Sequence, residues 1–432
     1  MRLREKIKRA LPKFMMGPLQ ELRNQLARSP LEELVLHGYS LIPDFDNKPR
    51  FTLLIPSIAP EKTFGGILTG MDIFLEIGKR AGADLRIVLD EIGPVPAGNS
   101  VADRARKLGI DPGRIEIVPR LNETPAIPIR SSDVFMVYNW WTALNLESLL
   151  EQQSRHFAQG PKPFLYIIQE YEPHFHPFSS THMMERQAFD PRLPCWGIFN
   201  SGELHAYFMA QGHKLERAYV FEPQLNSSLK AILARGPQKK TKRLLVYGRP
   251  AIARNCYPAV EKGIRAWATR YPEFADWEIV SAGLAHKPLP LGPGRVMTSA
   301  GKLGLQQYGE LLLGSAVGLS LMSSPHPSYP PLEMAHFGVR TVTNSYTNKD
   351  LSGSHENIIS IGNIAPDTIA DALARACREF ETDPDSGWRG RSLRPSFLEE
   401  GDFPFLAEVV ADLGHHAWAA AGSNERAATA RS

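Results

Sequence analysis

The pattern that most constrains the fold of this chain is the repeated alternation of short, continuously apolar segments with helical segments. A first series begins at residues 51–58 and ends near residue 200, and a second begins at residues 243–247 and ends near residue 380. Apolar strands separated by helices are typical of parallel sheets with both faces covered. The sequence therefore predicts two doubly wound, Rossmann-like α/β domains, with a ligand cleft between them at the carboxyl ends of the strands.

A polar, basic stretch over residues 236–243 separates the two series, and we place the domain boundary there. The first domain is predicted to span residues 31–237 and the second residues 238–391. Strands of the first series are expected at residues 51–58, 85–89, 115–118, 134–138, 164–168 and 197–200, with a helix over 70–81. Strands of the second series are expected at residues 243–247, 277–281, 295–298, 317–322 and 340–343, with helices at 257–270, 305–312 and 366–380 and one beginning at 332.

The first thirty residues carry a positive charge that the rest of the chain lacks. They hold eight Lys and Arg residues and two Glu residues, whereas the net charge of the whole chain is only +3. Residues 1–30 are therefore predicted to form a basic helix, which is either a solvated leader or an anchor on an anionic membrane surface. The mild overall charge argues against a nucleic-acid-binding protein.

The cysteines and the apolar runs bear on where the protein is expected to work. Cys195, Cys256 and Cys377 lie far apart, which fits a reducing compartment better than a disulfide framework. No apolar run reaches the roughly 18 residues of a membrane span, and the N-terminus lacks the apolar core of a signal peptide. We expect a cytoplasmic protein, peripheral at the inner face of the cell membrane if the leader is an anchor.

The segment YGRPAIARN, residues 247–255, combines a turn with two cations at the end of a predicted strand. Gly248 allows a tight turn, and Arg249 and Arg254 lie on the loop that enters the next helix. A helix N-terminus with two guanidinium groups outlines a pyrophosphate site, although the arginines could instead pair with surface acids. Lys302, in the loop after the strand at 295–298, is either a third phosphate-binding cation or a solvated loop residue.

Residues 323–338, SSPHPSYPPLEMAHFG, lead from a strand through a proline-rich loop into a short helix. Glu333 lies in the first turn, where the helix dipole stabilises a carboxylate. A carboxylate at this sheet edge can accept hydrogen bonds from a ribose diol, so Glu333 is a nucleotide-binding candidate, as is Tyr329 in the same segment. The alternative is that Glu333 only favours the helix.

The first series also places polar and aromatic residues at its strand ends. Gly65 and Gly66 form a loop that either lets a backbone approach a ligand or is a plain turn. Aromatic rings beside acids suit sugar recognition, and the candidates for acceptor binding or catalysis are Tyr138, Trp140, Glu170, Tyr171, Glu172 and His174, with Trp140 equally able to be core. No metal site is predicted, because the pair His174-x-His176 lacks a third placed ligand.

Three segments of the second series resemble a known family. KRLLVYGRPAIARN, AGKLGLQQYGELLLGSAVGLSLM and SPHPSYPPLEMAHFGVRTVTN are similar to the nucleotide-sugar domain of family 4 glycosyltransferases with the GT-B fold, and more closely to the bacterial rhamnosyltransferases of the WsaF type. The resemblance covers most of residues 240–360 and extends more weakly over 50–225. One departure is that the broad family has two glutamates eight residues apart, whereas this chain has Pro325 in place of the first and Glu333 as the second.

The resemblance implies a function and a set of roles. Arg249, Arg254 and Lys302 would stabilise the leaving diphosphate of a nucleotide sugar, expected to be dTDP-rhamnose, without a metal or other cofactor. The acceptor would be a lipid-linked bacterial glycan, transfer would retain the anomeric configuration, and any protein base would be Glu170, Glu172 or His174. The tail at residues 392–432 would cross back onto the first domain. An epimerase-like enzyme and a non-catalytic scaffold remain as alternatives, and the oligomeric state is open.

Overall fold

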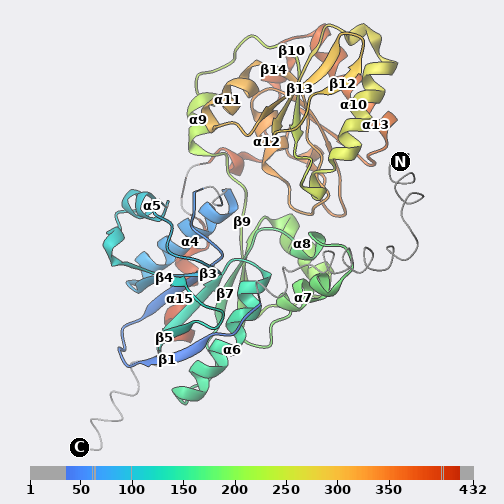
Figure 1. Ribbon diagram of the computed structural model, residues 1–432. Helices are drawn as coiled ribbons and strands as arrows, with labels where there is room; N and C mark the ends of the chain where they lie inside the picture. The colour runs from blue at the N-terminus through green and yellow to red at the C-terminus, as the bar shows by residue number, and fades with distance from the viewer. Residues whose placement is uncertain are drawn as a thin grey trace, which may run out of the picture.

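The computed structural model of the chain describes residues 36–418 apart from residues 61, 63, 64, 99, 400 and 402. The predicted basic helix over residues 1–30 lies outside the described residues. Two α/β bodies, each built on a seven-stranded sheet, lie one above the other in Figure 1. This arrangement confirms the predicted fold class of two doubly wound domains.

The first sheet is entirely parallel, in the order β4-β3-β2-β6-β7-β8-β9. Its strands are β2 (Arg50–Ile55), β3 (Asp84–Ile92), β4 (Ile115–Arg120), β6 (Asp133–Val137), β7 (Phe164–Ile168), β8 (Cys195–Asn200) and β9 (Arg217–Phe221). Every residue of β2, β6, β7 and β8 is buried, which is why these segments are continuously apolar or nearly so. The strand order reverses between β2 and β6, so a ligand crevice is expected at their carboxyl ends.

The second sheet has the order β12-β13-β11-β10-β14-β15-β16, with β12 antiparallel to β13 and the other pairs parallel. Its strands are β10 (Thr241–Gly248), β11 (Glu278–Gly283), β12 (Leu289–Gly292), β13 (Arg295–Gly301), β14 (Ser315–Leu319), β15 (Arg340–Asn344) and β16 (Ile358–Ile361). The order reverses between β10 and β14. The loops that follow these two strands, which carry the predicted diphosphate and ribose contacts, therefore meet at the switch point.

Helices cover both faces of each sheet (Figure 1). Those of the first domain are α4 (Gly65–Ala81), α5 (Val101–Lys107), α6 (Trp140–His156), α7 (Ser180–Ala188) and α8 (Gly202–Ala210). The later helices are α9 (Ser227–Leu233), α10 (Tyr257–Arg270), α11 (Leu305–Gly314), α12 (Tyr329–His336), α13 (Pro366–Thr382), α14 (Ser386–Arg389) and α15 (Leu406–Leu413). The pair β1 (Ser40–Asp44) and β5 (Ala126–Arg130) forms a small parallel sheet on the first domain, which the apolar pattern does not predict.

The chain passes between the domains twice. After β9 it enters α9, whose Leu229 and Ile232 pack with Leu312 and Leu313 of α11 in the core of the second domain. The first sheet thus ends well before residue 237, and residues 227–233 belong to the second domain rather than to the first, because their apolar side chains are buried there. At the other end, α15 lies against α4 in the core of the first domain (Figure 1).

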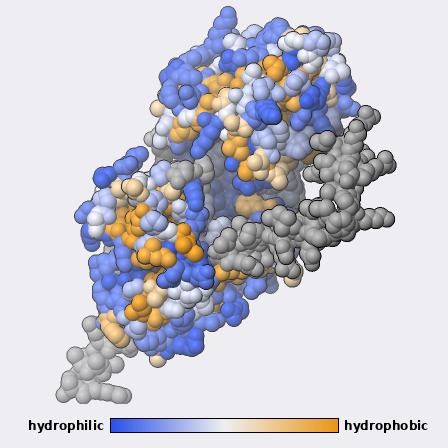
Figure 2. Space-filling model, viewed as in Figure 1, coloured by the Kyte–Doolittle hydropathy of each residue, from blue (hydrophilic) through white to orange (hydrophobic). Residues whose placement is uncertain are grey.

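The distribution of apolar residues bears on whether the described part of the chain contains a membrane-spanning helix. Hydrophilic residues cover most of the face drawn in Figure 2, and apolar residues gather in patches on both domains. None of the described helices is both long enough and apolar enough to cross a bilayer.

Candidate active site

The two domains touch at the carboxyl ends of their sheets. The Ser324 hydroxyl, which follows β14, donates to Oε1 of Glu170, which follows β7. Asn200 Nδ2, at the end of β8, donates to the Tyr329 hydroxyl over 3.3 Å. Residues far apart in the sequence are thereby brought together between the domains, where the cleft is predicted.

The turn after β10 is built for close approach of two loops. A Cβ atom on Gly248 would lie 2.1 Å from Oγ of Ser281, and one on Gly283, whose φ is 142°, would lie 2.4 Å from the Gly248 carbonyl oxygen. A side chain at Gly283 would collide with the backbone and strain φ, whereas one at Gly248 would have to displace the Ser281 side chain. The turn therefore sets Arg249 directly at the switch point of the second sheet.

Arg249 and Glu333 lie around the partly buried side chain of Tyr247. Burial raises the pKa of Tyr247, the charge of Glu333 adds to the rise, and Arg249 and Arg254 oppose it. Burial also raises the pKa of Glu333 to about 7, with the neighbouring Tyr308 acting in the opposite sense. A guanidinium and a carboxyl group that titrates near neutrality thus lie around one tyrosine at the switch point of the second sheet, and such groups can bind a diphosphate and a ribose.

Arg254 points toward the first domain. Its guanidinium carbon lies 4.6 Å from the ring centroid of Phe175, and its Nε lies 3.7 Å from Oε2 of Glu170. The backbone carbonyl of Arg254 accepts a hydrogen bond of 2.7 Å from the Ser323 amide, which ties this loop to the loop after β14. Cys256 caps the following helix with a φ of 52°, so the chain turns sharply just after the arginine. Arg254 therefore bridges the two domains.

Lys302 lies in the loop between β13 and α11, and its side chain is exposed. That loop also follows a strand of the second sheet, so the lysine is at the same edge as Arg249. Its role in phosphate binding stays a prediction.

The glycine pair of the first domain lies in the first turn of α4 and not in a loop before it. A Cβ atom on Gly66 would lie 2.5 Å from Oε1 of Gln169 and 3.0 Å from the Tyr138 hydroxyl. Gln169 also donates to the Gly66 carbonyl over 2.6 Å. A side chain at Gly66 would therefore have to displace the side chain of Gln169, whereas Gly65 is exposed with open space around it.

Two of the proposed acceptor residues, and the catalytic candidate Glu172 beside them, take part in the packing of the first domain. The rings of Trp140 and Tyr171 are each about 1 % exposed and lie in its apolar core. Glu172 accepts a 2.6 Å hydrogen bond from the Trp140 amide and one of 3.2 Å from the Tyr166 hydroxyl. It thus holds the first turn of α6, and burial raises its pKa to about 8. Neither ring presents a face for stacking on a sugar, and Glu172 is protonated at neutral pH, which does not suit a base.

The two histidines of the HxH pair point to different partners. His174 Nε2 lies 3.1 Å from the Tyr207 hydroxyl, while His176 Nδ1 lies 2.7 Å from Glu185. Burial lowers the pKa of His174, and its ring centroid is 5.8 Å from that of Tyr346 in the second domain. His174 is thus a neutral imidazole at the domain interface. Among the described residues, no three His, Cys, Asp or Glu side chains are grouped to hold a metal ion.

Lys349 is a component of the site that no sequence motif indicates. It is 1 % exposed, and its Nζ donates to the Met322 carbonyl over 2.9 Å in the loop after β14. Burial lowers its pKa to about 8, while Glu170 opposes the shift. A single lysine in the polar segment TNKD carries no signal of burial, so only the fold reveals it.

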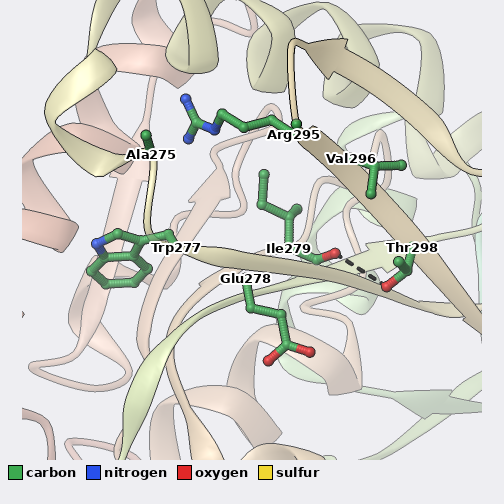
Figure 3. A pocket seen from close by; sticks show the side chains of 8 residues that line it. Ala275, Trp277, Glu278, Ile279, Arg295, Val296 and Thr298 are labelled. Atoms are coloured by element: carbon green, nitrogen blue, oxygen red, sulfur yellow. Dashed lines mark hydrogen bonds between the residues drawn. The ribbon is translucent and has the colours of Figure 1, made fainter.

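A cavity of about 220 Å³ lies elsewhere, at the amino ends of β11 and β13 (Figure 3). Arg295 in its wall donates to the carbonyls of Ala268 and Phe274, and Thr298 donates to the Ile279 carbonyl over 3.4 Å. These donors are thus paired within the domain, whereas Nε of Arg295 is buried and has no hydrogen-bond partner among the described residues. The cavity is at the end of the sheet opposite the cleft and is not part of the candidate site.

Two facing α/β domains, each built on a mostly parallel seven-stranded sheet, are the GT-B fold of glycosyltransferases. The trehalose-6-phosphate synthase OtsA has this architecture. One OtsA structure superposes with a TM-score of 0.51 at 12 % identity, covering 84 % of this chain and 99 % of OtsA. The apo structure of OtsA gives 0.53 at 13 %, covering 84 % and 98 %. At such identities the likeness shows the fold alone.

The family within this class follows from the sequence comparisons. The model described as WsaF, N-terminal domain, matches residues 50–202, and that described as WsaF, C-terminal domain, matches residues 242–374. This chain belongs to the WsaF family, as its motifs predicted. It is also 34 % identical over 212 residues to the O-antigen biosynthesis protein RfbC of Myxococcus xanthus, a match that spans 49 % of this chain and 16 % of RfbC.

Proposed function

We propose that this protein is a glycosyltransferase that transfers a sugar from a nucleoside diphosphate to a bacterial surface glycan. The single observation that carries the proposal is the meeting of Arg249, Glu333 and Arg254 at the switch point of the second sheet, opposite Glu170 of the first domain. Membership of the WsaF family and the likeness to an O-antigen biosynthesis protein support the glycan as the acceptor class.

Within this function, Arg249 and Arg254 bind the diphosphate and stabilise the charge that develops on it as the sugar leaves. Cations that are already in place do this without reorganisation, so the proposed mechanism needs no metal ion. Glu333 accepts hydrogen bonds from the ribose. Lys302, in the loop after β13 at the same edge of the sheet, is proposed to bind the phosphates as well. The proposed donor is dTDP-rhamnose, and the transfer is proposed to retain the anomeric configuration, as the family resemblance implies.

The first domain supplies the acceptor side. His174 is neutral and lies at the domain interface, so it is a better proton acceptor at pH 7 than Glu172, whose carboxyl is already protonated. The acceptor is proposed to be a lipid-linked glycan, and the basic residues 1–30 are proposed to hold the enzyme at the inner face of the membrane where such an acceptor lies.

The test is the thermal stability of the purified chain with dTDP, UDP, GDP, ADP and CMP in turn, without metal. A ligand at 100 times its dissociation constant adds about 2.7 kcal/mol to the free energy of unfolding, an easily measured shift. We expect a shift with dTDP that Arg249→Ala abolishes and that Arg265→Ala, an exposed arginine of α10, leaves unchanged. A shift with another nucleotide alone would overturn the rhamnose donor, and no shift with any nucleotide would overturn the transferase.

A further inference from the structure

The loop between β14 and α12 holds a buried histidine at its centre. His326 is 5 % exposed, and its backbone amide donates to Oγ of Ser324 over 2.9 Å. The Ser324 hydroxyl in turn donates to Glu170 of the first domain. His326 is therefore connected to Glu170 of the first domain through two hydrogen bonds, and it lies on a loop of the second domain that contacts the first domain.

The hydrogen bonds of this loop determine which ring nitrogen of His326 carries the proton. The Ser328 amide donates to Nδ1 over 3.0 Å, so Nδ1 is an acceptor and the hydrogen is on Nε2. Burial lowers the pKa of His326 to about 3, and the nearby charges of Lys349, Arg254 and Arg394 add to the shift. The ring is thus neutral at physiological pH, with a single N–H donor at Nε2.

That donor is unpaired. Nε2 of His326 is buried and has no hydrogen-bond partner among the residues that the structure describes. Oδ1 of Asn200, on the first-domain side, is likewise buried and unpaired, although its Nδ2 bonds to the Tyr329 hydroxyl. The ring of Tyr329 lies 5.9 Å from that of His326, so both unpaired atoms belong to residues around one tyrosine. Buried polar groups in native proteins are nearly always paired with protein, ordered water or a ligand, so these two open atoms beside Tyr329 are places where a polar group can bind.

We propose that Nε2–H of His326 donates a hydrogen bond to a hydroxyl oxygen of the transferred sugar, which makes His326 a specificity-determining residue for the donor. This proposal rests on the proposed function and adds to it the side chain that recognises the sugar of the donor. A sugar hydroxyl is suited to this role, because its oxygen accepts from His326 while its hydrogen stays available for an acceptor such as Oδ1 of Asn200.

The position of the loop favours the sugar over the phosphates as the partner. Glu333 and Tyr329 lie on the helix that follows His326, on the nucleotide side, and Glu170 and Asn200 lie across the domain boundary on the acceptor side. The sugar is the part of the donor that must lie between these two sides. Pro325 brings no polar side chain to the loop, and the diphosphate already has Arg249 and Arg254, which a neutral imidazole would not rival as an anion partner.

Two substitutions separate the donor atom from the role of the ring in the loop. His326→Asn keeps an acceptor near Nδ1 for the Ser328 amide and loses the N–H at the Nε2 position. His326→Gln is the matched control, because its amide nitrogen reaches the Nε2 position. Calorimetry would give the dissociation constants of dTDP and dTDP-rhamnose for both variants and the wild type, with UDP and UDP-glucose measured in parallel.

We expect His326→Asn to bind the nucleotide sugar three- to tenfold more weakly than the wild type and the nucleoside diphosphate equally well, with His326→Gln close to the wild type for both. Equal weakening for nucleotide and nucleotide sugar, or no change for either, would overturn the proposal. If the asparagine variant does not fold, the Nε2–H proton resonance of 15N-histidine-labelled wild type replaces it, and it must shift with the nucleotide sugar and not with the nucleoside diphosphate. A wild type that binds none of the four ligands contradicts the proposed function itself, before any variant is compared.

Discussion

Glu170 occupies the position of an anion beside one of the proposed diphosphate cations. Its Oε2 lies 3.7 Å from Nε of Arg254, and the two side chains are 12 % and 31 % exposed. The diphosphate of the donor carries negative charge to the same guanidinium, so Glu170 opposes nucleotide binding as long as it is ionised. We therefore predict that Glu170→Gln binds the nucleotide more tightly than the wild type does, although removal of a charged group from a binding site usually weakens binding.

The size of the effect follows from the distance and the partial burial. Two unit charges about 4 Å apart interact by about 4 kcal/mol at an effective dielectric constant of 20 and by about 1 kcal/mol in water. Because Arg254 is partly exposed, we expect a gain between these limits and nearer the lower one, about 1–2 kcal/mol, or a five- to thirtyfold lower dissociation constant. Glutamine can still accept the hydrogen bonds from Ser324 and from the Tyr171 amide, so the loop contacts persist.

The pH dependence supplies a second readout. Burial raises the pKa of Glu170, and Arg254 acts against the rise. Protonation removes the opposing charge, so the affinity of the wild type should approach that of Glu170→Gln as the pH falls through this pKa, and the gap between them should widen as the pH rises. Calorimetric titration of dTDP between pH 5 and pH 8 measures this gap.

The control is Glu278→Gln, which removes one negative charge at the amino end of β11, far from the cleft. It should leave nucleotide affinity close to that of the wild type. Weaker binding by Glu170→Gln would refute the reasoning, because it would mean that Glu170 supports Arg254 in binding the nucleotide. An equal gain in affinity with Glu278→Gln would also refute it, because it would mean that only the net charge of the protein matters.

Two predictions concern stability. Glu172→Gln should become more stable relative to the wild type as the pH rises from 5 to 8, by about 2 kcal/mol or more in thermal or urea unfolding. The pKa of Glu172 in the folded state, about 8, lies above the ordinary value of 4.5. In this pH range the folded wild type therefore holds a proton that the unfolded state has released, and it loses stability as the pH rises. A constant difference would mean that Glu172 is ionised in its buried position. Lys240→Met should lower the free energy of unfolding by about 2–4 kcal/mol, because a thioether cannot donate to the carbonyl oxygens that the lysine now pairs. The buried Nζ of Lys240 lies within 3.3 Å of four such oxygens, those of Leu312, Leu313, Ser315 and Phe337. The exposed Lys242→Met should change it by less than about 0.5 kcal/mol, and a similar loss in both would contradict this account.

The fold could be predicted largely from local patterns. Strands buried on both faces, such as β2 and β14, are continuously apolar, and α13 shows its buried face at helical spacing, so these elements are visible without the partners they pack against. The domain boundary was placed at the polar, basic residues 236–243, whereas the packing of α9 against α11 groups residues 227–233 with the second domain. Gly65 and Gly66 were placed in a loop because glycine favours turns, whereas contacts with Gln169 and Tyr138 hold Gly66 inside α4.

Two facing parallel-sheet domains could be predicted from residues close together in the chain, and so could the glycine turn, arginines and glutamate of the proposed nucleotide-sugar site. Which side chains meet between the domains depends on the folding of distant segments against one another. Glu170 and Arg254 are 84 positions apart, and neither their contact nor the burial of Lys349 or of His326 Nε2 has a local signature. Charge states follow the same division, because the pKa of Glu172 or Glu333 depends on how far burial removes water from the carboxyl group, and burial is a property of the assembled fold.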